Sequence, residues 1–151
     1  MTSMISGKSL RDIGFGVRVD KATAALPQTT TGTLFTVSGG RIILTSIVGE
    51  VTTIIQTQAN ATKLIATPTT GTAVDMCATL DITADEVGCL YGITGLQTDA
   101  LIGLNAGLTR LPSQLQVIPI GTIKLSCAAS NTGSVKWSMT YIPLDVGASV
   151  A

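Results

Sequence analysis

Apolar and polar residues alternate most regularly near the end of the chain. Two stretches, TIKLSCAA and SVKWSMTYI, place apolar side chains at every second position. Successive side chains of a β-strand point to opposite faces of a sheet, so this period of two predicts strands with one buried face. The predicted buried positions are Ile123, Leu125, Cys127, Ala129, Val135, Trp137, Met139 and Tyr141.

The segment between these stretches, SNTGS, predicts how they pair. If residues 131–133 form a three-residue loop, Cys127 lies opposite Trp137 and the apolar faces of both strands coincide. A four-residue loop would pair apolar faces with polar ones. Gly133 also falls where three-residue loops require a left-handed backbone. We therefore predict a β-hairpin with Cys127 and Trp137 as buried cross-strand neighbours.

A second apolar region, IILTSIVGEVTTII at residues 42–55, lacks strict alternation. Ten of its fourteen residues are β-branched, which suits a pleated sheet and crowds a helix. Apolar residues on both faces indicate a strand buried on two sides, and Gly49 is expected to mark a bulge, bend or turn. Further strands are predicted at residues 15–19, 33–37, 62–66, 74–82, 90–94 and 115–118, with one helical turn at 83–86.

Many short strands separated by turn residues predict an all-β fold, either a β-sandwich or a closed, jelly-roll-like β-barrel. The first thirty residues differ, because they carry a large share of the charges and lead into the linker-like LPQTTTG. We interpret residues 1–30 as an extended N-terminal arm or a first edge strand with a linker. Residues 31–151 form the predicted β domain.

The composition changes this picture in one respect: the chain has few charges with which to cover its surface. Charged residues are 12% of 151, against about 25% in typical domains, and the mean hydropathy is +0.49. We expect a surface rich in Thr, Ser, Gln and Asn, part of it buried against other subunits. The formal net charge is zero without the Lys and Arg clusters of nucleic-acid-binding proteins. No apolar run approaches the roughly 20 residues of a spanning helix. We therefore expect neither nucleic acid nor membrane as a partner.

Few residues are available for catalysis or metal binding. The sequence has no histidine, which excludes Ser-His-Asp and Cys-His arrangements. The acidic residues Asp75, Asp81, Asp85 and Glu86 could serve a glycosidase or hold calcium, but acids near a turn usually face solvent. The cysteines Cys77, Cys89 and Cys127 are expected to be buried and reduced, with a Cys77–Cys89 disulfide as the alternative. We predict no enzymatic activity, catalytic residues, cofactor, metal or small-molecule substrate.

Three segments carry a resemblance to a known group of proteins. TGTLFTVSGGRIILTSIVGEV, LDITADEVGCLYGITG and LSCAASNTGSVKWSMTYIPLD resemble small virion proteins of tailed bacteriophages, over about residues 31–145. Similar β-rich proteins serve as capsid decoration, or cement, proteins. The resemblance implies a homotrimer that is made in the host cytoplasm, binds the major capsid protein on the outer capsid surface and stabilises the head.

On this resemblance, residues 1–28 would be the arm that contacts the capsid. The implied contact residues are Lys8, Arg11, Phe15, Val17, Arg18 and Lys21. A tail, head-completion or fibre-associated structural role is the alternative, because no motif fixes a position on the particle. A carbohydrate-binding β-sandwich is a further alternative, although such modules expose Trp and Tyr, whereas Trp137 and Tyr141 are predicted in the core.

Overall fold

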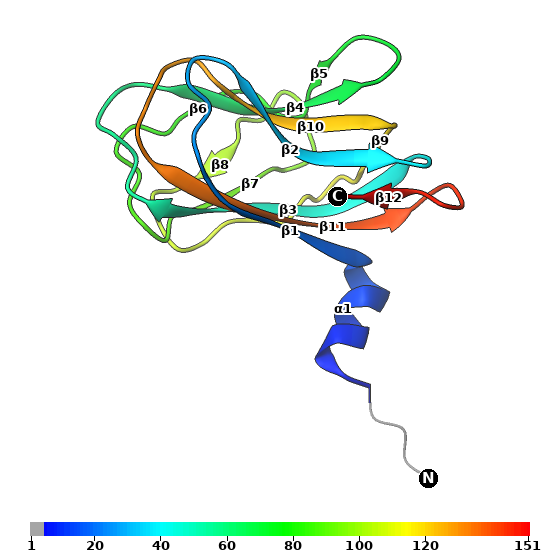
Figure 1. Ribbon diagram of the computed structural model, residues 1–151. Coiled ribbons are helices and arrows are strands. Elements are labelled where there is room, and N and C mark those ends of the chain that lie inside the picture. The colour runs from blue at the N-terminus through cyan, green and yellow to red at the C-terminus, as the bar shows by residue number, and fades with distance from the viewer. Residues whose placement is uncertain (1–4) are drawn as a thin grey trace.

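Two antiparallel β-sheets stacked face to face make up most of the computed structural model, which describes residues 5–151 (Figure 1). One helix, α1 (Gly7–Phe15), precedes the strands and projects from the sandwich. Neither sheet closes into a barrel within the described residues. The all-β prediction is confirmed, and of its two forms the structure adopts the sandwich-like one.

Sheet A is centred on the two longest strands. Its order is β1 (Val17–Ala25), β11 (Ser134–Pro143), β3 (Ile42–Thr53), β7 (Leu90–Gly92) and β8 (Ile102–Gly103), and β9 (Gln116–Ile118) pairs with the start of β3. The predicted strands at 42–55, 90–94 and 115–118 all lie in this sheet. The β-branched run predicted at 42–55 is confirmed as a strand over residues 42–53, and it is paired on both sides.

Sheet B packs against sheet A. Its order is β12 (Ser149–Val150), β2 (Thr31–Ser38), β10 (Gly121–Cys127), β4 (Ala61–Pro68) and β5 (Val74–Asp75), and β6 (Leu80–Asp81) pairs with the start of β4. The strand predicted at 74–82 is therefore two short strands. The helical turn predicted at 83–86 is wrong, because these residues form a non-helical turn with Ala84 at φ 57°.

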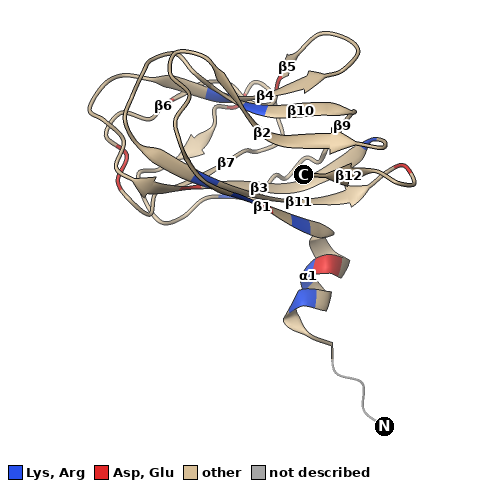
Figure 2. Ribbon diagram, in the orientation of Figure 1, with Lys and Arg blue, Asp and Glu red and all other residues tan. Residues whose placement is uncertain are grey.

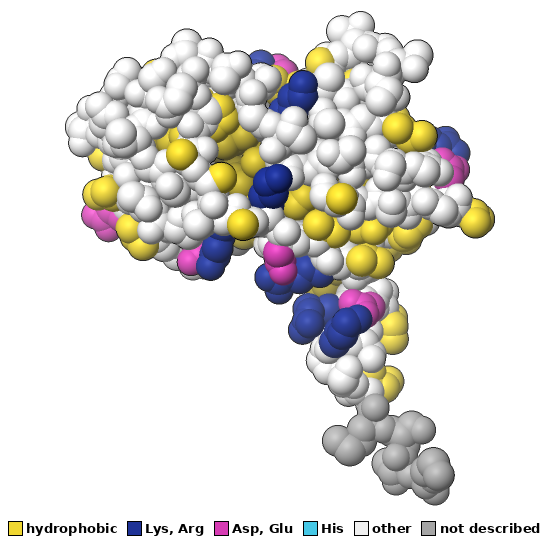
Figure 3. Space-filling model, viewed as in Figure 1, with side chains coloured by type: hydrophobic (Ala, Val, Ile, Leu, Met, Phe, Trp, Pro, Cys, Tyr) yellow, Lys and Arg dark blue, Asp and Glu magenta, His cyan; other side chains and the backbone are white. Residues whose placement is uncertain are grey.

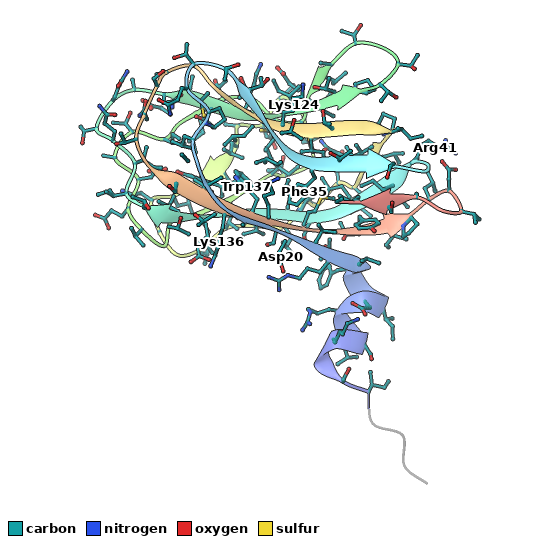
Figure 4. All side chains as sticks on the ribbon, viewed as in Figure 1. Asp20, Phe35, Arg41, Lys124, Lys136 and Trp137 are labelled. Atoms are coloured by element: carbon teal, nitrogen blue, oxygen red, sulfur yellow. The ribbon has the colours of Figure 1, made fainter. Side chains whose placement is uncertain are left out.

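The core fills the space between the sheets. Alternate residues of β10 and β11 are buried, as the period of two predicted. Figure 4 shows Phe35 and Trp137 pointing into this space from opposite sheets. All three cysteines are buried and none forms a disulfide, so the prediction of buried, unpaired thiols is confirmed.

The predicted hairpin of β10 and β11 is wrong. The two strands lie in different sheets, β10 between β2 and β4, and β11 between β1 and β3. Cys127 is paired with Thr62, and Trp137 with Gly49. Alternation fixes which face of each strand is buried, but an apolar face is buried equally well by a neighbour in the same sheet and by the opposite sheet. The pattern therefore could not choose between a hairpin and a crossing.

Residues 128–133 cross from sheet B to sheet A, and Asn131 anchors this crossing. Its side chain is completely buried, and its amide Nδ2 donates hydrogen bonds to the carbonyl oxygens of Gln56 and Gln58 at 3.3 and 2.7 Å. Gly133 has φ 132°, and a Cβ there would lie 2.7 Å from Cδ1 of Ile55. Asn131 and Gly133 therefore stabilise the segment that connects the two sheets and are not part of a hairpin loop.

Gly49 occupies a position that the sequence did not reveal. The expectation that it marks a bulge, bend or turn is wrong, because it lies inside β3 where the register with β11 is unbroken. A Cβ on it would meet three ring atoms of Trp137 at 2.9 Å. The pairing register continues from Trp137 through Gly49 and Tyr91 to Gly103. Each aromatic ring in this row lies over a glycine of the next strand, and the two ring centroids are 6.3 Å apart.

The region predicted as an arm and linker, residues 1–30, contributes a strand to the sandwich, and β2 begins directly after it at Thr31. Residues 17–25 form β1, the edge strand of sheet A, paired along β11 from Val17 to Ala25. The edge-strand interpretation of this region is therefore confirmed for residues 17–25. Removal of residues 1–28 would strip a strand from the sheet.

Candidate docking surface

Helix α1 has local signals at both ends. The Ser6 hydroxyl accepts a hydrogen bond from the Ser9 amide at 3.1 Å, which is the usual N-cap geometry. Lys8 pairs with Asp12 one turn later at 2.5 Å. Gly16, at φ 88°, ends the helix and donates its amide hydrogen to the Asp12 carbonyl oxygen at 3.1 Å. This helix was not predicted, although the Ser cap and the Lys8–Asp12 spacing are visible in the sequence.

The helix is amphipathic, and its apolar side is uncovered. None of its residues is buried, and the side chains of Leu10 and Ile13 are 59% and 74% exposed. These two residues are three positions apart and therefore share a face. Figure 3 shows apolar atoms along one side of the helix and cationic side chains along the other. The helix thus presents a narrow apolar stripe to its surroundings.

The base of the helix is fixed to sheet A. The buried hydroxyl of Thr45 donates a hydrogen bond to the Phe15 carbonyl oxygen. Gly16 lies so close to β11 that a Cβ would fall 2.0 Å from the Tyr141 carbonyl oxygen. The direction in which α1 leaves the sandwich is therefore set by contacts at its C-terminal end.

The predicted capsid-contacting residues divide between two elements. Lys8, Arg11 and Phe15 lie on α1, whereas Val17, Arg18 and Lys21 lie on β1. Arg18 pairs with Asp20 at 2.9 Å on the exposed side of β1. The structure therefore brings these residues together along one helix–strand unit and not along an extended arm.

A turn at residues 145–148, held by hydrogen bonds to Arg41, lies at the end of the sandwich from which α1 projects. The Arg41 guanidinium and amide donate to the Asp145 carboxylate in three hydrogen bonds of 2.8 Å, and this pairing holds the pKa of Asp145 far below its usual value. The Asp145–Ala148 turn displays Val146 fully exposed, close to the exposed side chains of Ile142 and Leu144. Figure 3 shows apolar atoms at this end of the sandwich and beside the helix.

The structure separates the acidic residues that are close in sequence. Asp75 pairs with Lys63 at 2.6 Å, and Asp81 accepts hydrogen bonds from Asn60 and Thr83. Asp85 is buried and accepts a hydrogen bond from the Tyr91 hydroxyl at 2.6 Å, and burial raises the pKa of its carboxyl. No group of three potential metal ligands among His, Cys, Asp and Glu occurs in the described part of the chain.

A cleft with a volume of about 470 Å³ opens between β5 and β9. Gln116 spans it by donating from Nε2 to the carbonyl oxygens of Met76 and Gly95, both at 3.2 Å. Sugar-binding modules stack ligands on exposed aromatic rings. Of the five aromatic residues only Phe15 is exposed, and it lies on α1 rather than in this cleft.

Comparison with known proteins does not assign a function to this arrangement of residues. No helix within residues 5–151 has the length and apolar character that crossing a membrane requires. Comparisons with protein-family models, curated proteins and solved structures find no match to this chain.

Proposed function

We propose that this chain is a structural subunit of a virus particle, a capsid decoration protein that stabilises a tailed-phage head by binding its major capsid protein. The observation that carries this proposal is α1, a nine-residue helix with no buried residue. Isolated helices shorter than about 12–15 residues are marginal in water. The helix therefore depends on a second surface to cover its apolar face, and a neighbouring protein supplies that surface.

The geometry of α1 suits docking into a groove. Leu10 and Ile13 have the i, i+3 spacing of the apolar side chains with which amphipathic helices bind apolar grooves. Lys8 and Arg11 would lie at the rim of such a contact. The attachment at Thr45 fixes the direction of the helix before binding, which lowers the entropy lost on association. The sandwich would then sit on the partner as a rigid body.

The end of the sandwich beside α1 supports the same proposal. Ile142, Leu144 and Val146 are exposed there, and the Arg41–Asp145 pairing holds the turn that carries Val146. Contiguous exposed apolar surface marks sites of protein interaction. A protein that binds only the assembled shell shifts assembly toward the shell by mass action, so this function needs contact area and no chemical step.

The direct test is binding to shells that lack the protein, measured by co-sedimentation. We expect Leu10→Asp and Ile13→Asp to reduce occupancy at least tenfold while the thermal melt of the sandwich is unchanged. Leu108→Asp, at an exposed leucine outside α1, is the matched control and should bind normally. Full occupancy by the α1 variants would refute the docking proposal.

Copy number per particle separates a decoration protein from the alternatives. Quantitative mass spectrometry of purified particles should find on the order of hundreds of copies, because a decoration protein follows the symmetry of the shell. A tail, head-completion or fibre-associated protein would be present in about a dozen copies or fewer.

A further inference from the structure

The open side of the sandwich between β1 and β2 contains a narrow apolar slot. Leu34 and Leu125 of sheet B and Val135 and Trp137 of sheet A line it, and Lys21 stands at its rim. Figure 3 shows this side of the molecule as a hollow of apolar atoms bordered by cationic side chains. Its volume is about 80 Å³, far below the roughly 300–1,000 Å³ of small-molecule sites. The slot therefore fits one small side chain.

The sequence of β1 keeps the slot open. The pairing of β1 with β11 is interrupted by a bulge between Lys21 and Ala24, and bulges bend an edge strand away from its regular path. Ala22, Ala24 and Ala25 are too small to cover the apolar floor. Lys21 belongs to none of the ion pairs found among residues 5–151. An apolar floor thus lies beside a lysine that makes no ion pair within the described residues.

A complementary feature occurs at residues 86–88. Val87 is 63% exposed, Glu86 is exposed beside it, and Glu86 belongs to no ion pair within the described residues. The turn has a fixed shape, because the Glu86 amide donates to Asn105 Oδ1 at 2.8 Å and the Gly88 amide to the Val51 carbonyl oxygen at 2.9 Å. It therefore displays a small apolar side chain next to an anion.

Charge is segregated along the chain although the total is zero. No Lys or Arg occurs between Lys63 and Arg110, a stretch with five acidic residues. Residues 1–30 hold four basic and two acidic residues, and Figure 2 shows the basic ones along α1 and β1. Opposite potentials on two surfaces steer them together and fix their register.

The turn and the slot of one molecule cannot meet. Lys21 lies on β1 at one edge of sheet A, whereas residues 86–88 lead into β7, with β11 and β3 between the two strands. A contact between them must join two copies. We propose that the turn of one copy inserts Val87 into the slot of a second copy, where Glu86 pairs with Lys21. This head-to-tail contact is heterologous, so repetition yields a ring or a filament. It does not involve α1 and stands independently of the proposed capsid docking.

Sedimentation velocity of the full chain over a range of concentrations tests the contact. The wild type should associate as concentration rises, and added salt should weaken the association. Glu86→Lys and Lys21→Glu should each raise the dissociation constant at least tenfold, and Val87→Asp should abolish association. A chain that carries both charge reversals should regain it. Val74→Asp, at an exposed valine on β5 outside both the slot and the turn, is the control and should associate like the wild type.

Three results would overturn the inference: a wild type that stays monomeric up to millimolar concentration, single reversals without effect, or a folded double reversal that fails to associate. Circular dichroism and thermal melts establish that each variant is folded. Failure of this contact is distinguishable from failure of capsid docking. A monomer that still binds shells through α1 refutes only the self-association, and an oligomer that ignores shells refutes only the docking.

Discussion

Replacement of Gly49 by alanine tests the packing of the aromatic row directly. The added Cβ would lie 2.9 Å from three ring atoms of Trp137, whereas carbon atoms in contact prefer about 3.5–4.0 Å. The ring is buried and stacked on Tyr91, so moving it away from the added carbon would disturb that stacking. Overpacking of this kind costs about 1–3 kcal/mol, and replacing a strand glycine returns about 0.5–1 kcal/mol through chain entropy. We expect a net loss of about 1–2 kcal/mol in the free energy of unfolding.

Urea denaturation measures this loss, and the thermal midpoint should fall by about 2–8 °C for a chain of this size. Gly107→Ala is the matched control, because its Cβ would meet only the Gly88 carbonyl oxygen at 3.7 Å. Trp137→Leu in the Gly49→Ala background should recover part of the loss relative to the sum of the single changes, because the clash disappears. A Gly49→Ala protein as stable as the wild type would refute the argument that the ring requires glycine.

Three further changes probe the buried polar group and the crossing. Burial raises the pKa of Asp85, so ionisation of this carboxyl disfavours folding, with no cost below the unfolded pKa of about 3.9 and the full cost above the folded pKa. Asp85→Asn should therefore gain stability relative to the wild type as the pH rises from 3 to 7. A stability difference that is constant with pH would contradict this sign. Asn131→Ala should cost about 1–3 kcal/mol in urea denaturation, because the carbonyl oxygens of Gln56 and Gln58 lose a buried donor. Gly133→Val should cost about 1 kcal/mol or more, because its Cβ would meet Ile55 and its φ is positive. Gly147→Ala is the control: with φ 87° and no neighbour within 4 Å, it measures the backbone cost of a positive φ without a steric clash.

The helix shows a limit of pattern reading in a short segment. The N-cap at Ser6 and the Lys8–Asp12 spacing were present in the sequence, but nine residues give barely one repeat of an amphipathic period. The charges of residues 1–30 therefore suggested one arm. The structure divides them between a helix and a strand, because β11 offers an open edge on which residues 17–25 pair.

The sequence by itself determined which side chains are buried in the long strands. The period of two in β10 and β11 and the β-branched run of β3 specify strands and their apolar faces through local geometry. They also predicted that Trp137 lies in the core. These properties depend on one strand at a time, so they can be read from consecutive residues.

Only the tertiary structure decided which strands are neighbours. Cys127 and Trp137 both face the core, yet they come from opposite sheets, because two stacked sheets bury apolar faces as well as one hairpin does. The contact of Gly49 with Trp137 and the hydrogen bonds of Asn131 join residues that are distant in sequence. Asp85 and Tyr91 are close in sequence, but the turn between them decides that their side chains meet. Their positions follow from the packing of layers in three dimensions, which no period along the chain encodes.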